Sequence, residues 1–162
     1  MHKKRLLEIE RKFLVTSTAF KKKAYKIEHI IQGFLNRDPE RTVRVRLHNE
    51  DGVLTVKGLS SEDGLKRFEW EKEISKKEAK ALFEFCEAGI IDKLRHTIKV
   101  GAHDFEVDEF FGDNKGLIIA EIELNDENEH FEKPDWLGEE VTGQIKYYNS
   151  QLSKEPYNTW KK

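Results

Sequence analysis

Charged and apolar side chains alternate along many segments of this chain, and this period of two restricts the fold more than any other feature. Successive side chains of a β-strand point to opposite faces, so each such segment has one charged and one apolar face. In segment 7–13, Glu8, Glu10 and Lys12 share a face opposite the apolar residues. The same split recurs in segments 43–47, 67–74, 93–100, 105–108 and 120–124.

The alternating segments and the turn residues between them predict a mainly β, α+β fold. We expect strands near residues 6–15, 30–35, 42–48, 53–58, 66–74, 92–100, 104–111 and 117–125. Turn residues predict two hairpins, at Asn49-Glu50-Asp51-Gly52 and Gly101-Ala102-His103, and a third turn at 112–116.

Short helices are expected at 18–24 and 145–153, and the clearest helix is expected at 76–88. Ser75 is a good N-cap, Glu78 completes a capping box, and Gly89 can adopt the left-handed conformation after the last turn. The apolar stripe of the longest helix predicts that it packs on the sheet. That stripe consists of Ala79, Leu82, Phe83 and Cys86.

The composition predicts one globular domain spanning residues 1–162 and argues against several classes of function. Charged residues make up 37% of the chain, but ten Phe, three Trp and four Tyr exclude a disordered chain. A net charge of −2 disfavours a nucleic-acid binder. No apolar run is long enough for a membrane span, and the start, Met1–Arg5, has no apolar leader core. The single cysteine, Cys86, favours a cytoplasmic protein and a role in packing.

Two geometries are consistent with the alternation. An open sheet would pack helices on its apolar face and leave the charged face in water. A closed sheet would direct the charged faces into a lumen, with helices outside. Like charges two residues apart favour the closed form, because each pair repels unless a ligand of opposite charge lies between its members. These pairs are Glu8/Glu10, Arg44/Arg46, Glu69/Glu71 and Glu121/Glu123.

The charged residue types indicate the chemistry of the ligand. Carboxylates without histidine or cysteine partners are typical of a hard-cation site, for Mg²⁺ or Mn²⁺. Arginine and lysine together are typical of phosphate recognition. The combination therefore predicts a metal-bound polyphosphate. Glycine-rich phosphate loops are absent, and the six histidines show no ligand spacing.

These motifs also resemble those of a known family. The segment Glu8-Ile9-Glu10-Arg11-Lys12 resembles the Glu-x-Glu-x-Lys opening signature of the CYTH superfamily, the triphosphate tunnel metalloenzymes. The tail Glu140-Val-Thr-Gly to Lys146-Tyr-Tyr-Asn149 looks like the closing segment of that family. The order of the remaining motifs matches as well: Arg44-x-Arg46, Lys57, Arg67-x-Glu69-x-Glu71, Lys93-x-Arg95, Asp108 and Glu121-x-Glu123.

The resemblance implies a closed, eight-stranded antiparallel barrel with a charged tunnel, helices packed outside and a C-terminal helix near one mouth. It implies metal ligands at Glu8, Glu10, Glu121, Glu123 and Asp108. It implies phosphate-binding residues at Lys12, Arg44, Arg46, Lys57, Lys93, Arg95 and Lys146. Catalytic roles are expected for Glu69, Glu71 and Lys12. Lysine at position 146 departs from the arginine of many relatives and would lose a bidentate contact. Arg67, Glu73 and Asp108 are equally compatible with structural ion pairs.

The activity expected is metal-dependent hydrolysis of inorganic triphosphate to pyrophosphate and phosphate by direct attack of water. A class IV adenylyl cyclase or a thiamine or nucleoside triphosphatase would use the same lumen. A polyphosphate-binding module without catalysis is the alternative of another class. Outward apolar residues that helices leave uncovered could form a homodimer interface.

Overall fold

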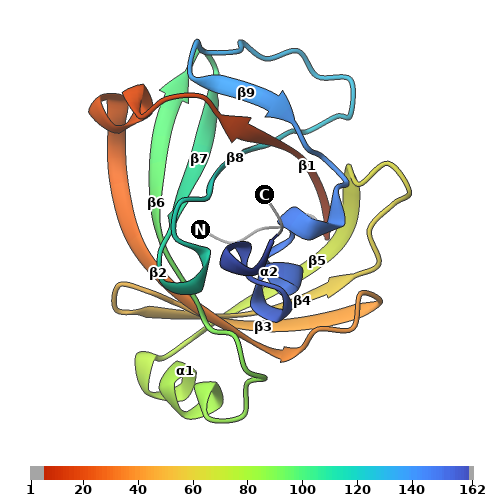
Figure 1. The fold of residues 1–162 in the computed structure, drawn as a ribbon. Coiled ribbons are helices and arrows are strands. Elements are labelled where there is room, and N and C mark those ends of the chain that lie inside the picture. The colour runs from red at the N-terminus through yellow and green to blue at the C-terminus, as the bar shows by residue number, and fades with distance from the viewer. Residues whose placement is uncertain (1–5, 161–162) are drawn as a thin grey trace.

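The computed structural model describes residues 6–160, and nine strands account for most of it (Figure 1). Residues 1–5, for which the sequence analysis expects no leader core, lie outside the described residues. The strands are β1 (Leu7–Val15), β2 (Ala24–Asn36), β3 (Arg41–His48), β4 (Asp51–Gly58), β5 (Lys66–Ile74), β6 (Ile91–Val100), β7 (His103–Phe110), β8 (Ile118–Glu123) and β9 (Leu137–Glu140).

The sheet closes on itself, as predicted. All strand pairs are antiparallel, in the order β5-β4-β3-β2-β6-β7-β8-β1, and β1 also pairs with β5. Leu7 lies opposite Phe68 of β5, while Glu10 lies opposite Glu123 of β8. One strand therefore joins both edges and removes them. The eight-stranded barrel is confirmed, and the ninth strand, β9, adds to β1 from outside the predicted set.

Local turn chemistry explains the hairpins. Asn49 adopts a positive φ of 51° between β3 and β4, and Gly101 one of 62° between β6 and β7. Both predicted hairpins are therefore confirmed. Strand β2 is longer than its predicted range of 30–35, because residues 24–29 also pair with β6.

The helices are short. They are α1 (Lys76–Phe83), α2 (Asn149–Lys154) and the 3₁₀ helices η1 (Ala19–Lys23), η2 (Gly112–Asn114), η3 (Ile145–Tyr147) and η4 (Tyr157–Thr159). The capping box of Ser75 and Glu78 is present at the start of α1. None of the helices within residues 6–160 has the length and apolarity of a membrane span.

Helix α1 ends at Phe83, five residues before the predicted end, so Gly89 does not cap it. Beyond the helix, the N–H of Glu87 donates to the carbonyl of Phe34 on β2, a partner that a continued helix could not reach. Half-buried Cys86 lies against Gly33, as expected for a packing residue. Gly89 does have a positive φ, of 101°.

Two apolar cores hold the barrel, one on each side of its wall. The outer core packs η1 and residues 131–136 against the outward faces of β1, β7 and β8, with Phe20, Phe105 and Trp136 at its centre. The inner core contains Phe34, Ile91, Phe110 and Ile119, which point into the barrel, together with Val141, Tyr147 and Leu152 of the C-terminal segment. The register shows this direction, because Phe110 lies opposite Lys93, which lines the cavity.

The C-terminal segment (residues 141–154) thus occupies one end of the barrel, where Figure 1 shows α2 within the ring of strands. The 60–65 loop touches this segment closely, since a Cβ on Gly64 would lie 2.2 Å from Cα of Gly143. The charged lumen therefore has an apolar floor. Alternation alone did not reveal it, because Phe34, Ile91 and Phe110 stand at the inward positions where other strands carry charges.

Leu152→Ala tests the importance of this floor for stability. Leu152 has no exposed surface, so its truncation leaves a cavity in the inner core and lowers the free energy of unfolding by about 2–5 kcal/mol. Exposed Ile145 in the same segment provides the control, because Ile145→Ala changes it by less than about 0.5 kcal/mol. Urea unfolding followed by circular dichroism measures both. Equal effects would contradict the packed floor.

Candidate active site

A cavity of about 940 Å³ lies within the barrel, and most of the predicted site residues line it. These are Glu8, Glu10, Lys12, Arg44, Arg46, Lys57, Glu69, Glu71, Lys93, Arg95, Glu121 and Glu123. Asp108 and Lys146 are not among its lining residues. The residues come from strands far apart in the chain, and closure of the sheet brings them together.

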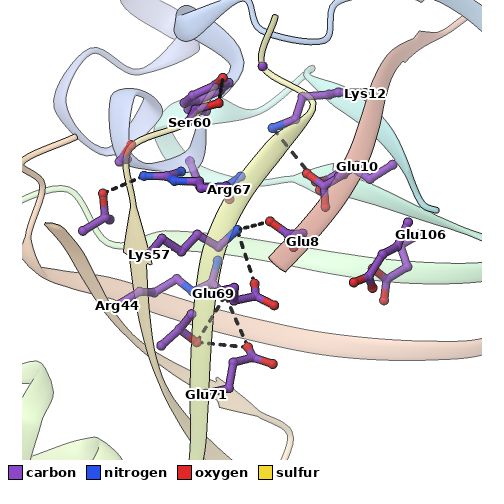
Figure 2. Close-up of a pocket in the computed structure, with 18 of the residues that line it drawn as sticks. Glu8, Glu10, Lys12, Arg44, Lys57, Ser60, Arg67, Glu69, Glu71 and Glu106 are labelled. Carbon is purple, nitrogen blue, oxygen red and sulfur yellow. Dashed lines mark hydrogen bonds and ion pairs between the residues drawn. The ribbon is translucent and has the colours of Figure 1, made fainter. Parts of the chain in front are cut away.

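The strand register places acidic residues beside basic residues on neighbouring strands. Lys12 lies opposite Glu121, and their side chains are 4.0 Å apart. Lys57 lies opposite Glu69, and its Nζ contacts Glu8 Oε1 at 3.0 Å and Glu69 Oε2 at 3.5 Å. Figure 2 shows Glu8, Lys57 and Glu69 converging from three different strands.

Glu10 and Glu121 form the centre of an acidic group. Burial, together with the charges of Glu121 and Glu8, holds the pKa of Glu10 well above its usual range. Burial alone would also raise the pKa of Glu121. The charge of Lys12, a hydrogen bond with Glu10 and the charge of Arg95 together hold that pKa below its usual value. These opposite directions favour a protonated Glu10 beside a charged Glu121. A cation can take the place of that proton.

The donors of this group fit a hard divalent cation, since carboxylate oxygens are the ligands that Mg²⁺ and Mn²⁺ prefer. In the described part of the chain, no three His, Cys, Asp or Glu side chains already form a compact ligand set. The ion pairs of Lys57 and Lys12 explain this, because each draws a carboxylate toward itself. Exposed Glu123 also lines the cavity, opposite Glu10 in the strand register.

Four basic residues form a second group on β3 and β6: Arg44, Arg46, Lys93 and Arg95. Burial, with the charges of Arg44 and Arg95, lowers the pKa of Arg46 to about 9. Burial and the nearby arginines lower the pKa of Lys93 to about 7, against the effect of Asp108. Like charges held this close favour binding of an anion, which would relieve their repulsion.

The guanidinium of Arg44 is incompletely hydrogen-bonded. Its guanidinium is buried, and Nε has no hydrogen-bond partner among residues 6–160. One terminal nitrogen reaches Thr55 Oγ1 at 3.4 Å and lies 3.8 Å from Glu71 Oε2. A buried donor without an acceptor is costly. Arg44 lines the cavity, and its guanidinium is suited to a phosphate oxygen there.

Asp108 and Lys146 do not line the cavity, and their roles as metal ligand and phosphate ligand stay predictions. Asp108 has no exposed surface and lies behind the basic group, where it accepts two bonds from Arg95, at 2.8 and 3.0 Å, and contacts Lys93 at 2.8 Å. Its charge is therefore used in holding two cations. Lys146 is exposed, and its Nζ lies 4.8 Å from the ring centroid of Trp160.

Several lining or bridging residues carry no signal in the charge pattern, among them Gln32, His48, Tyr148 and Asn149. Tyr148 places its ring 5.0 Å from Lys12 Nζ and 6.0 Å from the guanidinium carbon of Arg67. Gln32 and Asn149 are neutral, so the pattern of charges gives no signal for them. Glu106 also lines the cavity, and it lies on the charged face of segment 105–108, although the predicted site residues did not include it.

Metal binding is expected to depend on pH through Glu10. Its raised pKa favours the protonated form at low pH, and that proton competes with a cation for the same oxygens. Added Mg²⁺ or Mn²⁺ should therefore raise the melting temperature more at pH 8 than at pH 5.5. A shift of about 5–10 °C corresponds to about 2.7 kcal/mol at a hundredfold excess over Kd.

The control for this thermal-shift experiment is Glu10→Gln, which removes the titrating carboxylate and should give a small shift at both pH values. A metal-induced shift in the wild type that is the same at pH 5.5 and pH 8 would contradict the role of Glu10.

Comparisons with known proteins agree with this geometry. The CYTH domain model matches residues 6–156. The chain is 48% identical to an inorganic triphosphatase of Acetivibrio thermocellus over 95% of its own length and 97% of the relative. It is 33% identical to an inorganic triphosphatase of Nitrosomonas europaea over 91% of its own length and 97% of the relative. A crystal structure of an inorganic triphosphatase superposes on this chain with a TM-score of 0.63 at 29% identity. The match covers 90% of this chain and 93% of that structure. The chain belongs to the CYTH domain family.

Proposed function

We propose that this chain hydrolyses inorganic triphosphate to pyrophosphate and phosphate within the barrel cavity, using Mg²⁺ or Mn²⁺. The observation that carries the proposal is the presence of an acidic and a basic group in one cavity. A metal-bound polyphosphate has charges of both signs and would neutralise the repulsion within each group. The similarity to relatives named inorganic triphosphatases, over nearly their whole length, supports this choice of substrate.

In this proposal the basic residues hold the substrate. Arg44, Arg46, Lys93 and Arg95 bind phosphate oxygens of the anion near the floor, where Asp108 holds two of these cations in place. Lys57 and Lys12 bind phosphate oxygens closer to the acidic group and stabilise charge that develops on the leaving group. Arg67 supports this wall through its bonds to Gly58 and Thr42.

The acidic residues hold the metal and the attacking water. Glu8, Glu10, Glu121 and Glu123 are the proposed metal ligands. A bound divalent cation supplies Lewis-acid stabilisation of phosphate charge. Glu71 is suited to orienting water, because its side chain is 31% exposed and one oxygen is fixed by Thr55 at 3.1 Å. Glu69 is almost fully buried and fixes Lys57.

The proposal also includes the cell compartment and the partners of the protein. One half-buried cysteine fits a reducing, cytoplasmic setting, and neither a nucleic acid nor a membrane is part of the proposed activity. A homodimer would use exposed apolar side chains where β1 meets β5, among them Leu7, Phe68 and Trp70. Light scattering of the purified protein tests for the dimer.

Phosphate release from inorganic triphosphate, ATP and thiamine triphosphate, each with Mg²⁺ and with Mn²⁺, tests the activity. We expect release from inorganic triphosphate to be the fastest and Glu10→Gln to lower kcat at least about a hundredfold, because the metal site is lost. Circular dichroism controls for folding. Cyclic AMP formed from ATP would favour the cyclase, and faster release from thiamine triphosphate or ATP would favour those substrates. Binding without any release would favour the non-catalytic module.

The phosphate role of Arg44 is tested by Arg44→Lys, which keeps the charge and loses the planar pair of donors. We expect KM for inorganic triphosphate to rise about tenfold, the equivalent of one lost charge-assisted hydrogen bond. Arg41→Lys is the matched control on the same strand, because Arg41 is exposed and pairs with Asp38 at 2.7 Å. Equal KM values for the two variants would remove Arg44 from the binding set.

A further inference from the structure

Two neutral side chains connect the basic group to the C-terminal segment. Gln32 lies on β2 and is fully buried, while Asn149 begins α2 and lines the cavity. They are 117 residues apart in the chain, and Gln32 Nε2 donates to Asn149 Oδ1 at 2.8 Å. Each of them also contacts one cation: Gln32 contacts Arg46, and Asn149 contacts Lys93.

The direction of every bond in this bridge is determined by chemistry. Arg46 Nε can only donate, so Gln32 must present its oxygen to it, at 3.0 Å. The amide nitrogen of Gln32 then faces Asn149. Lys93 Nζ can also only donate and does so to Asn149 Oδ1 at 2.9 Å. The oxygen of Asn149 therefore accepts from two donors, and neither amide can be reversed without losing a bond.

The bridge holds two cations that would otherwise repel each other. Arg46 and Lys93 lie on different strands, β3 and β6, and β2 runs between them in the sheet. Amide oxygens accept from both without adding charge, so the group keeps its net positive charge for an anion. A carboxylate at either position would cancel part of that charge, as Asp108 already does for Lys93 and Arg95.

The position of Asn149 depends on the inner core. Tyr147 and Leu152, on either side of it in the chain, are buried in that core, and Ser153 Oγ contacts the carbonyl of Ala88 at 3.4 Å. The oxygen of Asn149 therefore reaches Lys93 and Gln32 only while the C-terminal segment is packed against the barrel.

We propose that Gln32 and Asn149 are positioning residues that set Arg46 and Lys93 for phosphate binding, which makes anion affinity depend on docking of the C-terminal segment. The identity of the anion rests on the proposed function. Hydrolysis is not required, because the bridge acts on binding.

Calorimetry of inorganic triphosphate binding to the full chain, without divalent metal, tests this inference. We expect Gln32→Met and Asn149→Leu each to weaken binding about tenfold, because each removes an acceptor from a cation. The double variant should weaken binding by about thirtyfold rather than a hundredfold, because both changes remove the same Gln32–Asn149 bond. Thermal unfolding of each variant sets a temperature at which all are folded. If Gln32→Met does not fold, Gln32→Glu replaces it and should also weaken binding.

Ser153→Ala is the matched control. It removes a buried hydroxyl of the same helix that contacts Ala88 and Arg37 and touches neither cation of the bridge. Binding by this variant should stay within about twofold of the wild type. Equal weakening by Ser153→Ala and Asn149→Leu would overturn the positioning role, because loose docking alone would then explain it.

Other outcomes separate this inference from the proposed function. Wild-type affinity in both bridge variants would overturn the inference alone, as would a hundredfold loss in the double variant. Weakened binding in the variants of a protein that does not hydrolyse triphosphate would support the inference and overturn the proposed function. A wild type that does not bind triphosphate would overturn both.

Discussion

The pairing of β1 with β5 is the interaction on which the rest of the structure depends. Without it, the charged faces of the strands would lie in water, where like charges two residues apart are screened and hydrated. With it, they face one another across a small, partly buried space. Each carboxylate or guanidinium then loses water and must find a partner of opposite charge or a ligand. Closure of the sheet therefore turns an ordinary amphipathic pattern into a binding site.

The protein solves the resulting electrostatic problem in two ways. Some charges are neutralised permanently, as where Asp108 lies between Lys93 and Arg95. Others are left incompletely matched: burial and the charges of Glu121 and Glu8 raise the pKa of Glu10, and Arg44 has a buried nitrogen without an acceptor among residues 6–160. Glu10 and Arg44 line the cavity, and the fully paired carboxylate of Asp108 does not. This division separates the residues that hold the wall together from those that are available to a metal-bound anion.

The inner core gives the cavity its direction. A barrel lined by charge from end to end would be open to water on both sides. Here Phe34, Ile91 and Phe110 occupy inward positions at one end and bury Tyr147 and Leu152 of the C-terminal segment. The hydrophobic effect thus holds a segment that also contributes polar groups to the cavity, Tyr148 and Asn149. Stability of the floor and geometry of the basic group are consequently coupled through the same short stretch of chain.

The alternation of side chains along a strand and the chemistry of turns are local properties. The sequence alone therefore predicts the features that depend on them. Most strand positions, the Ser75 capping box, the hairpins and the charged face that carries Glu8, Arg44, Lys93 and Glu121 on their strands follow from neighbouring residues. Only the tertiary structure decided that Asp108 lies behind the cations, that Lys146 lies outside the cavity, and that Gln32 meets Asn149. Those contacts join residues far apart in the chain, and the packing of the inner core determines them. A period of two gives the face of a strand on which a side chain lies, but its distance along the barrel and its neighbours across the lumen depend on the whole fold.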